Sequence, residues 1–234
     1  MEELEAELRR AKSLSVAELA DSIESIGFEC TRCGGCCTAD EIPGDDTAET
    51  EPHTATVFPD EARELQDAAT EAFGESYDWR DVVRPMPYGL QGGESGETTD
   101  GETFEWAIRT DSCGDCTFYA EAEDGTGACT VHGSRPLICR TYPFSVALGG
   151  TAEPMGEAVD RDGLVRAHEC EGLGRDISRD EAEALAAALK KRAVREIEEA
   201  IGVRDNYEPA AVDGIVVHDS EGQKRPDGTP IEDT

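Results

Sequence analysis

Basic side chains are scarce in this chain of 234 residues. Lys and Arg number 21, only four of them Lys, against 53 Asp and Glu, which gives a formal net charge of −32. Such a charge repels the phosphates of nucleic acids and anionic membranes, so we expect neither as a partner. The acidic residues are spread along the whole chain, which is typical of halophilic acidic proteins. We therefore expect unfolding or metal loss at low salt.

Large apolar side chains are also scarce. Leu, Ile, Val and Phe together make up 41 of the 234 residues, which at this net charge is typical of disordered chains. No apolar run approaches the roughly 20 residues of a membrane helix. The first residues, MEELEAELRRAKSL, lack the apolar region of a signal peptide, so we expect a cytoplasmic protein. Bound metal is expected to add the stability that a small core lacks.

Common enzyme motifs are missing from the sequence. It contains no phosphate-binding GxxxxGK(S/T) loop, no HExxH and no GxSxG, and the CxxxC of Cys33 and Cys37 lacks the further cysteine of a CxxxCxxC motif. Paired carboxylates are too numerous to indicate acid or base catalysis. Whether the protein is an enzyme is left open.

Apolar periodicity predicts helices in three parts of the chain. Residues 3–26 predict one or two helices, residues 59–73 a second helical segment that begins at Pro59, and residues 177–202 a third that begins with a capping box of Ser178 and Glu181. Each segment is expected to end at a glycine, namely Gly27, Gly74 and Gly202.

We predict an α+β fold in which helices frame a small, irregular, cysteine-rich, metal-bound core with a short strand or hairpin. Residues 103–110 read as the strand, with Phe104, Trp106 and Ile108 on one face. The expected organisation is an N-terminal helical segment (1–27), a cysteine-cluster metal-binding domain (28–175), a C-terminal helix (176–202) and a loose acidic tail (203–234).

Nine cysteines form two groups and one later residue. The first group is Cys30, Cys33, Cys36 and Cys37, the second is Cys113, Cys116, Cys129 and Cys139, and Cys170 follows. Two residues between cysteines let a tight turn direct both sulfurs at one ion, and the Gly34–Gly35 pair relieves crowding there. Disulfides or buried structural thiols are the alternative, but an odd cysteine count in a cytosolic chain favours metal.

Cysteine spacing does not decide between zinc and an iron-sulfur cluster. The CxxCxxC of Cys30, Cys33 and Cys36 matches the first three ligands of a bacterial ferredoxin run, but Cys37 follows at once and no proline comes after it. Adjacent cysteines point in different directions, so a remote fourth ligand or two neighbouring sites is expected. Nine cysteines suffice for two four-thiolate sites with one left over.

Four sequence segments together resemble a known family. They are FECTRCGGCC (28–37), CTFY (116–119), CTVHGSRPLICRTYPF (129–144) and HECEGLG (168–174). This combination resembles the YkgJ-type cysteine-cluster family (CxxCxxCC), proposed to chelate zinc or iron, over about residues 28–175. The resemblance implies these metal ligands: Cys30, Cys33, Cys36, Cys37, Cys116, Cys129, Cys139 and Cys170.

Cys113 falls outside the family pattern, and His132 replaces a tyrosine that relatives often have. The related flagellin lysine methylases carry a similar cysteine cluster, so the resemblance favours an iron-sulfur cluster, of the 4Fe-4S type, with zinc as the alternative. We expect the first and second cysteine groups to close on each other around the metal.

Several polar side chains lie near the expected ligands. Arg140 and Arg135 are expected to offset thiolate charge or bind an anionic group, with packing as the alternative for Arg140, and Arg135 with Pro136 is expected to shape the turn before Cys139. His168 and His132 are candidate nitrogen ligands, weighed against an ordinary surface or supporting role.

Three functions follow from these expectations. An iron-sulfur cluster implies electron transfer or a redox-linked role with an unidentified redox or protein partner. Zinc in closed sites implies a structural or partner-binding module. The methylase resemblance alone implies an accessory or catalytic role in protein modification such as lysine methylation.

Overall fold

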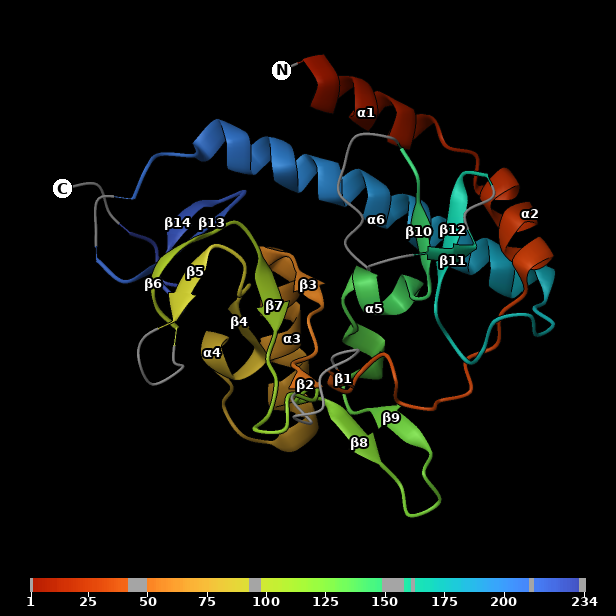
Figure 1. The fold of residues 1–234 in the computed structure, drawn as a ribbon, viewed down its shortest axis with the longest axis horizontal. Helices are drawn as coiled ribbons and strands as arrows, with labels where there is room; N and C mark the ends of the chain where they lie inside the picture. The colour runs from red at the N-terminus through yellow and green to blue at the C-terminus, as the bar shows by residue number, and fades with distance from the viewer. Residues whose placement is uncertain are drawn as a thin grey trace. The chain divides into compact units, whose positions relative to one another are not determined.

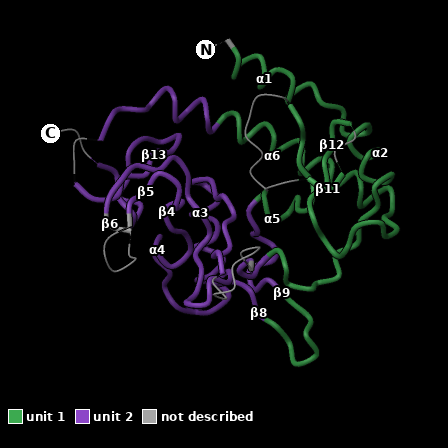
Figure 2. The backbone as a smooth tube through the Cα atoms, in the orientation of Figure 1, with its two compact units in different colours: residues 1–36, 121–127, 137–198 green, residues 37–120, 128–136, 199–234 purple. Residues whose placement is uncertain are grey.

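The computed structural model describes residues 2–41, 50–92, 98–148, 158–160, 163–210 and 213–231. The backbone forms two compact units, each assembled from segments that are distant in sequence (Figure 2). Unit 1 comprises residues 1–36, 121–127 and 137–198, and unit 2 comprises residues 37–120, 128–136 and 199–234. Both units combine helices with small sheets, which confirms the predicted α+β class.

Unit 1 combines helices with a three-stranded antiparallel sheet (Figure 1). Its helices are α1 (Glu2–Ser13), α2 (Val16–Ile26), α5 (Leu137–Thr141) and the larger part of α6 (Arg179–Asn206). Its sheet has the order β10 (Phe144–Val146), β12 (Val165–His168), β11 (Ala158–Asp160). None of the helices in the described residues is long and apolar enough to cross a membrane.

The first helical segment consists of two helices, in agreement with its prediction. Ser15 caps the start of α2, where its Oγ accepts a hydrogen bond from the Glu18 backbone N–H at 3.4 Å. Gly27 ends α2 with a φ of 77°, and its N–H donates to the Ile23 carbonyl at 2.8 Å. The chain therefore leaves α2 immediately before the first cysteine group.

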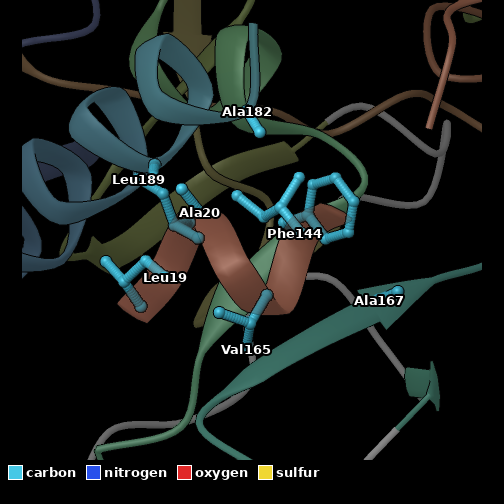
Figure 3. Packing of buried hydrophobic residues seen from close by; sticks show 9 residues of the cluster. Leu19, Ala20, Phe144, Val165, Ala167, Ala182 and Leu189 are labelled. Atoms are coloured by element: carbon cyan, nitrogen blue, oxygen red, sulfur yellow. The ribbon is translucent and has the colours of Figure 1, made fainter. Parts of the chain in front are cut away.

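A buried apolar cluster joins α2, β10, β12 and α6 in unit 1 (Figure 3). Its members are Leu19, Ala20, Ile23, Phe144, Val165, Ala167, Ala182, Ala186 and Leu189. Full burial of each large aliphatic or aromatic side chain contributes about 1.5–3 kcal/mol. The ring of Phe28 packs edge-on against Phe144 with centroids 5.7 Å apart. The core thus fixes the segment that leads into Cys30.

A buried arginine connects α6 to α5 within unit 1. Arg192 is 2% exposed, and its Nη1 donates to Thr141 Oγ1 at 3.1 Å and to the Phe144 carbonyl at 3.3 Å. Its Nε donates to the Glu196 carboxylate at 2.6 Å. Because a buried charge must be hydrogen-bonded to be tolerated, these contacts fix α5, which carries Cys139, against the long helix.

Unit 2 combines helices with several small sheets. Its helices are α3 (Pro59–Phe73), α4 (Trp79–Val82) and the short 3-10 helix η1 (His132–Ser134). One sheet has the order β3 (Thr56–Val57), β7 (Trp106–Ile108), β4 (Val83–Pro85). Another has the order β14 (Gly222–Lys224), β13 (Ile215–Asp219), β6 (Thr98–Thr103), β5 (Leu90–Gly92), with β13 parallel to β6.

Two further strand pairs lie next to cysteines. The strands β1 (Asp40–Glu41) and β2 (Thr50–Glu51) form an antiparallel pair of two residues each that follows Cys37. The strands β8 (Tyr119–Glu121) and β9 (Gly127–Cys129) form a hairpin that ends on Cys129.

Helix α3 has the predicted bounds. Pro59 is its first residue, and the Glu61 carboxylate accepts the Phe58 backbone N–H at 3.2 Å. Gly74 follows the helix in the left-handed conformation, with φ 72°, and its N–H donates to the Thr70 carbonyl at 2.9 Å. Local sequence signals are therefore sufficient to place this helix.

Residues 203–234 differ from the expected loose tail, because β13 and β14 belong to the four-stranded sheet of unit 2. Asp219 is 2% exposed and accepts hydrogen bonds from Trp106 Nε1 at 2.8 Å and from Lys224 Nζ at 2.7 Å. Lys224 Nζ also lies 5.6 Å from the ring centroid of Trp79. The apolar run GIVV is a strand whose partner, β6, is more than 100 residues away in sequence.

Helix α6 continues to Asn206 and does not end at Gly202 as predicted. A Cβ atom added to Gly202 would lie 2.5 Å from the Cβ of Ser220, so close packing requires the glycine. The Ser220 N–H donates to the Glu199 carboxylate at 2.8 Å, and Asn206 Nδ2 donates to the Ser220 carbonyl at 2.7 Å. These contacts with the β13–β14 turn hold the last turns of the helix.

The predicted strand at residues 103–110 is divided, because β6 ends at Thr103 and β7 begins at Trp106. Trp106 and Ile108 are buried in β7, but Phe104 is 47% exposed and does not share their buried face. The Phe104 ring instead stacks on His218, with centroids 5.2 Å apart.

Candidate metal centre

The nine cysteines lie in described residues and are divided between the two units, and none forms a disulfide. Unit 1 contains Cys30, Cys33, Cys36, Cys139 and Cys170. Unit 2 contains Cys37, Cys113, Cys116 and Cys129. Each unit therefore combines cysteines from both sequence groups. The boundary between the units falls between the adjacent residues Cys36 and Cys37.

In unit 1, the segment before Cys30 pairs with the segment after Cys170. Phe28 and Leu173 form an antiparallel bridge, the Glu29 N–H donates to the Gly172 carbonyl at 3.0 Å, and the Gly174 N–H donates to the Gly27 carbonyl at 3.0 Å. The pairing brings the HECEGLG segment to the first cysteine loop, although about 140 residues separate them.

Glycines make this close approach possible. A Cβ atom added to Gly172 would lie 2.3 Å from the Glu29 carbonyl oxygen, and one added to Gly27 would lie 2.5 Å from the Arg175 carbonyl oxygen. Real Cβ atoms do not approach backbone oxygens so closely, so no side chain fits at either position without movement of the backbone.

The Cys170 thiol lies in the electrostatic neighbourhood of the first cysteine group. Burial raises the pKa of Cys170, the Gly172 N–H donated to its Sγ at 3.4 Å lowers it, and the thiols of Cys33, Cys36 and Cys30 raise it. Cys170 is half-buried, while the three loop cysteines are exposed. The pKa of Cys170 thus depends on the cysteines of the first group as well as on its own burial.

The CxxCxxC loop has a tightly curled backbone. Arg32 and Gly34 adopt left-handed conformations with φ values of 60° and 84°. Arg32 Nε donates to the Gly127 carbonyl at 3.0 Å, and the Gly127 N–H donates to the Arg32 carbonyl at 2.7 Å. A Cβ atom added to Gly35 would lie 3.8 Å from Cys33 Sγ. Arg32 therefore attaches the loop to Gly127 through both its side chain and its backbone carbonyl.

Cys139 and Cys170 are connected through the YPF segment of unit 1. Cys139 is half-buried on α5, three residues before Tyr142, whose hydroxyl donates to the Glu169 carbonyl. Phe144 is fully buried in the core. The tyrosine hydroxyl thus fixes the backbone just before Cys170, a positioning role that the sequence analysis did not identify.

In unit 2, Asp111 organises a tight turn around Cys113 and Cys116. Its carboxylate accepts the backbone N–H groups of Cys113 at 2.8 Å and Asp115 at 3.1 Å, and its carbonyl accepts the Gly114 N–H at 3.2 Å. Gly114 has a φ of 89°. This side-chain turn was not predicted, although an aspartate two residues before a CGxC segment is a recognisable turn signal.

Neighbouring segments of unit 2 are attached to this turn. The Cys116 N–H donates to the Cys37 carbonyl at 2.8 Å, and the Asp115 carboxylate accepts the Ala39 N–H at 2.8 Å. The Thr130 N–H and hydroxyl donate to the Phe118 carbonyl at 2.9 and 3.1 Å, next to Cys129. Three separate chain segments with cysteines therefore meet within unit 2.

The histidines take different positions. His168 is 2% exposed, and its Nε2 lies 2.8 Å from Ser145 Oγ, so this nitrogen is engaged in the core of unit 1. His132 is exposed on η1. His53 donates its backbone N–H to the Gly114 carbonyl at 2.8 Å. Burial lowers the His53 pKa, which Asp40 partly opposes, so its imidazole is neutral at pH 7.

The two arginines expected near the metal lie in different surroundings. Arg135 Nε donates to the His132 carbonyl at 3.2 Å, so its guanidinium holds η1 and shapes the turn before α5. Arg140 is exposed on α5, next in sequence to Cys139.

Among the described residues, no three Cys, His, Asp or Glu side chains stand close enough together to hold a metal ion as they are placed. The donor set itself is suitable for metal. Thiolates from closely spaced loop cysteines, with further cysteines supplied by distant segments, suit tetrahedral zinc and iron-sulfur clusters alike.

The structure thus defines a class of α+β protein with nine cysteines carried on several separate chain segments. The family model described as "CxxCxxCC: Putative zinc- or iron-chelating domain" matches residues 29–171. The match spans more than half of the chain and contains all nine cysteines, so the chain belongs to this family. Searches of the curated proteins and of the solved structures found no match.

Proposed function

We propose that unit 1 binds an iron-sulfur cluster of the 4Fe-4S type and serves electron transfer or a redox-linked activity. One observation supports this proposal most directly: the Phe28–Leu173 bridge and the hydrogen bond from the Glu29 N–H to the Gly172 carbonyl bring the segment of Cys170 to the loop that carries Cys30, Cys33 and Cys36. A CxxCxxC run with a remote fourth cysteine is the ligand set of a ferredoxin-type cluster.

The surroundings of these thiols support exchange of electrons with a partner. A bound cluster would supply one-electron chemistry. Cys30, Cys33 and Cys36 are exposed, so a partner can approach them closely. The Gly172 N–H donates to Cys170 Sγ at 3.4 Å, and hydrogen bonds to ligand sulfurs tune a cluster's potential. Cys139 is a further thiol of the same unit, and exposed Arg140 adds positive charge beside it.

The metal is identified by analysis of the whole protein, purified without oxygen in high salt. Iron, acid-labile sulfide and zinc are measured per chain together with the visible spectrum. Stoichiometric iron and sulfide, with a colour that dithionite reversibly bleaches, would support the proposal. Stoichiometric zinc in a colourless sample would contradict it and indicate a zinc-stapled structural or partner-binding module.

Two variants test the ligand set. Cys33→Ser and Cys170→Ser each remove one thiolate of the proposed set, so both should lose most iron, sulfide and visible absorbance. Thr31→Ser lies in the same loop, carries no thiol and should keep wild-type values. Full iron content in both cysteine variants would rule out this ligand set.

A further inference from the structure

We infer that unit 2 contains a second metal site, in which Cys37, Cys113, Cys116 and Cys129 bind one zinc ion. This site goes beyond the cluster proposed for unit 1 and shares no ligand with it. It gives a role to Cys113, which the family resemblance leaves unexplained. All four cysteines belong to unit 2, although residues 121–127 of unit 1 lie between Cys116 and Cys129 in the sequence.

The backbone of the Cys113–Cys116 turn already has the form of a metal-binding loop. Asp111 fixes the N–H groups of Cys113 and Asp115, at 2.8 and 3.1 Å, which sets the direction of the turn before any metal binds. A Cβ atom added to Gly114 would lie 3.1 Å from Ala39 Cβ, so the turn packs closely on the segment after Cys37. Two residues between cysteines are the usual spacing of zinc ligands on one turn.

The other two cysteines reach the same turn through backbone hydrogen bonds. Cys37 is joined directly, since its carbonyl accepts the Cys116 N–H at 2.8 Å. Cys129 immediately precedes Thr130, whose N–H donates a hydrogen bond to the Phe118 carbonyl at 2.9 Å. Phe118 lies two residues after Cys116. Backbone hydrogen bonds therefore link the chain segments that carry Cys37, Cys116 and Cys129. No three of the four thiols stand close enough together to hold an ion as they are placed, so metal binding has to draw the thiols together.

Zinc fits this region better than an exposed cluster. Cys116 is buried, and Cys37 and Cys129 are half-buried, as in closed structural zinc sites. The neighbouring strands β1 and β2 have two residues each, too few to hold the segment after Cys37 by pairing alone. A four-thiolate zinc site would stabilise this region, because metal binding contributes directly to folding.

The decisive variant is Cys113→Ser in the full chain, with metals measured after anaerobic purification with zinc and iron supplied. Cys113 is exposed, so its replacement by serine leaves no cavity and removes only the thiol. We expect this variant to lose about one zinc per chain relative to wild type and to keep its iron, sulfide and visible spectrum. Ser112→Ala, in the same turn, should keep all metals.

Zinc K-edge absorption of the wild-type protein is the second measurement, and it is independent of variant folding. Four sulfur ligands would support the site, and a mixed nitrogen and oxygen shell would overturn it. Three other results would also overturn the site. They are an unchanged zinc content in Cys113→Ser, a loss of iron instead of zinc in that variant, and wild-type protein that contains no zinc. If the cluster proposal alone fails, the wild-type protein contains zinc but no iron or sulfide. The loss of zinc in Cys113→Ser can then still be measured.

Discussion

At the residue scale, the site depends on side chains and glycines that carry no metal-binding signal of their own. The cysteines stand out by their spacing, because CxxC pairs are conspicuous in any sequence, and the family resemblance implies eight of them as ligands. Asp111, Tyr142 and Gly172 were not identified. Asp111 bonds backbone groups within its own turn, whereas Tyr142 and Gly172 contact the backbone of distant segments, which spacing does not reveal.

Gly172 offers the sharpest test at this scale. In Gly172→Ala the new Cβ would lie 2.3 Å from the Glu29 carbonyl oxygen, so the segment after Cys170 has to move away from the cysteine loop. We expect a loss of about 1–3 kcal/mol in the free energy of unfolding, together with lower iron retention. Denaturant titration and metal analysis measure both quantities.

Gly133→Ala is the matched control for Gly172→Ala. A Cβ atom at Gly133 would meet nothing within 4 Å, so this variant should keep wild-type stability and metal content. Equal behaviour of the two variants would show that the close approach of residues 27–29 to residues 172–174 has no energetic importance.

At the element scale, helices were predictable and most strands were not. Helices α2 and α3 carry their apolar periodicity and their end signals within a few residues, as at Ser15, Gly27 and Gly74. The strands are two to six residues long, and β13 pairs with β6 across more than 100 residues. Strands this short show too little alternation to be recognised, and their partners are not local.

Gly202 shows how a tertiary contact overrides a local helix signal. Gly to Ala inside a helix normally stabilises it by about 1 kcal/mol. Here the added Cβ would lie 2.5 Å from Ser220 Cβ, and overpacking of this kind costs about 1–3 kcal/mol. We therefore expect Gly202→Ala to be less stable than wild type by chemical denaturation.

A double variant separates the two effects at Gly202. Ser220→Gly removes the opposing Cβ, so Gly202→Ala should become neutral or stabilising in that background. If Gly202→Ala stabilises the wild-type chain, the contact with Ser220 is not tight and does not explain why a glycine occupies this position.

At the scale of the whole molecule, the sequence correctly indicated the mixed fold class. It did not reveal how distant segments assemble, because unit 2 gathers residues 37–120, 128–136 and 199–234. Periodicity describes single elements, whereas such units are defined by contacts between elements.

The net charge of −32 makes the stability of both units depend on ionic strength. Screening weakens attractive pairs such as Arg179 with Asp21 and Glu24, at 2.5 and 2.6 Å, but such exposed pairs contribute little to stability. The 53 acidic residues exceed the 21 basic ones, so relief of repulsion outweighs this loss. The Debye length falls from about 10 Å at 0.1 M salt to about 3 Å at 1 M.

We therefore expect the free energy of unfolding and the retained metal to rise together between dilute and molar sodium chloride. Circular dichroism during denaturant titration gives the first quantity, and metal analysis after dialysis gives the second. Potassium chloride at equal ionic strength should act alike, because screening depends on ionic strength and not on the particular cation. Stability and metal content that stay constant across this range would show that the dispersed carboxylates do not oppose folding, and that the acidic composition serves solubility alone.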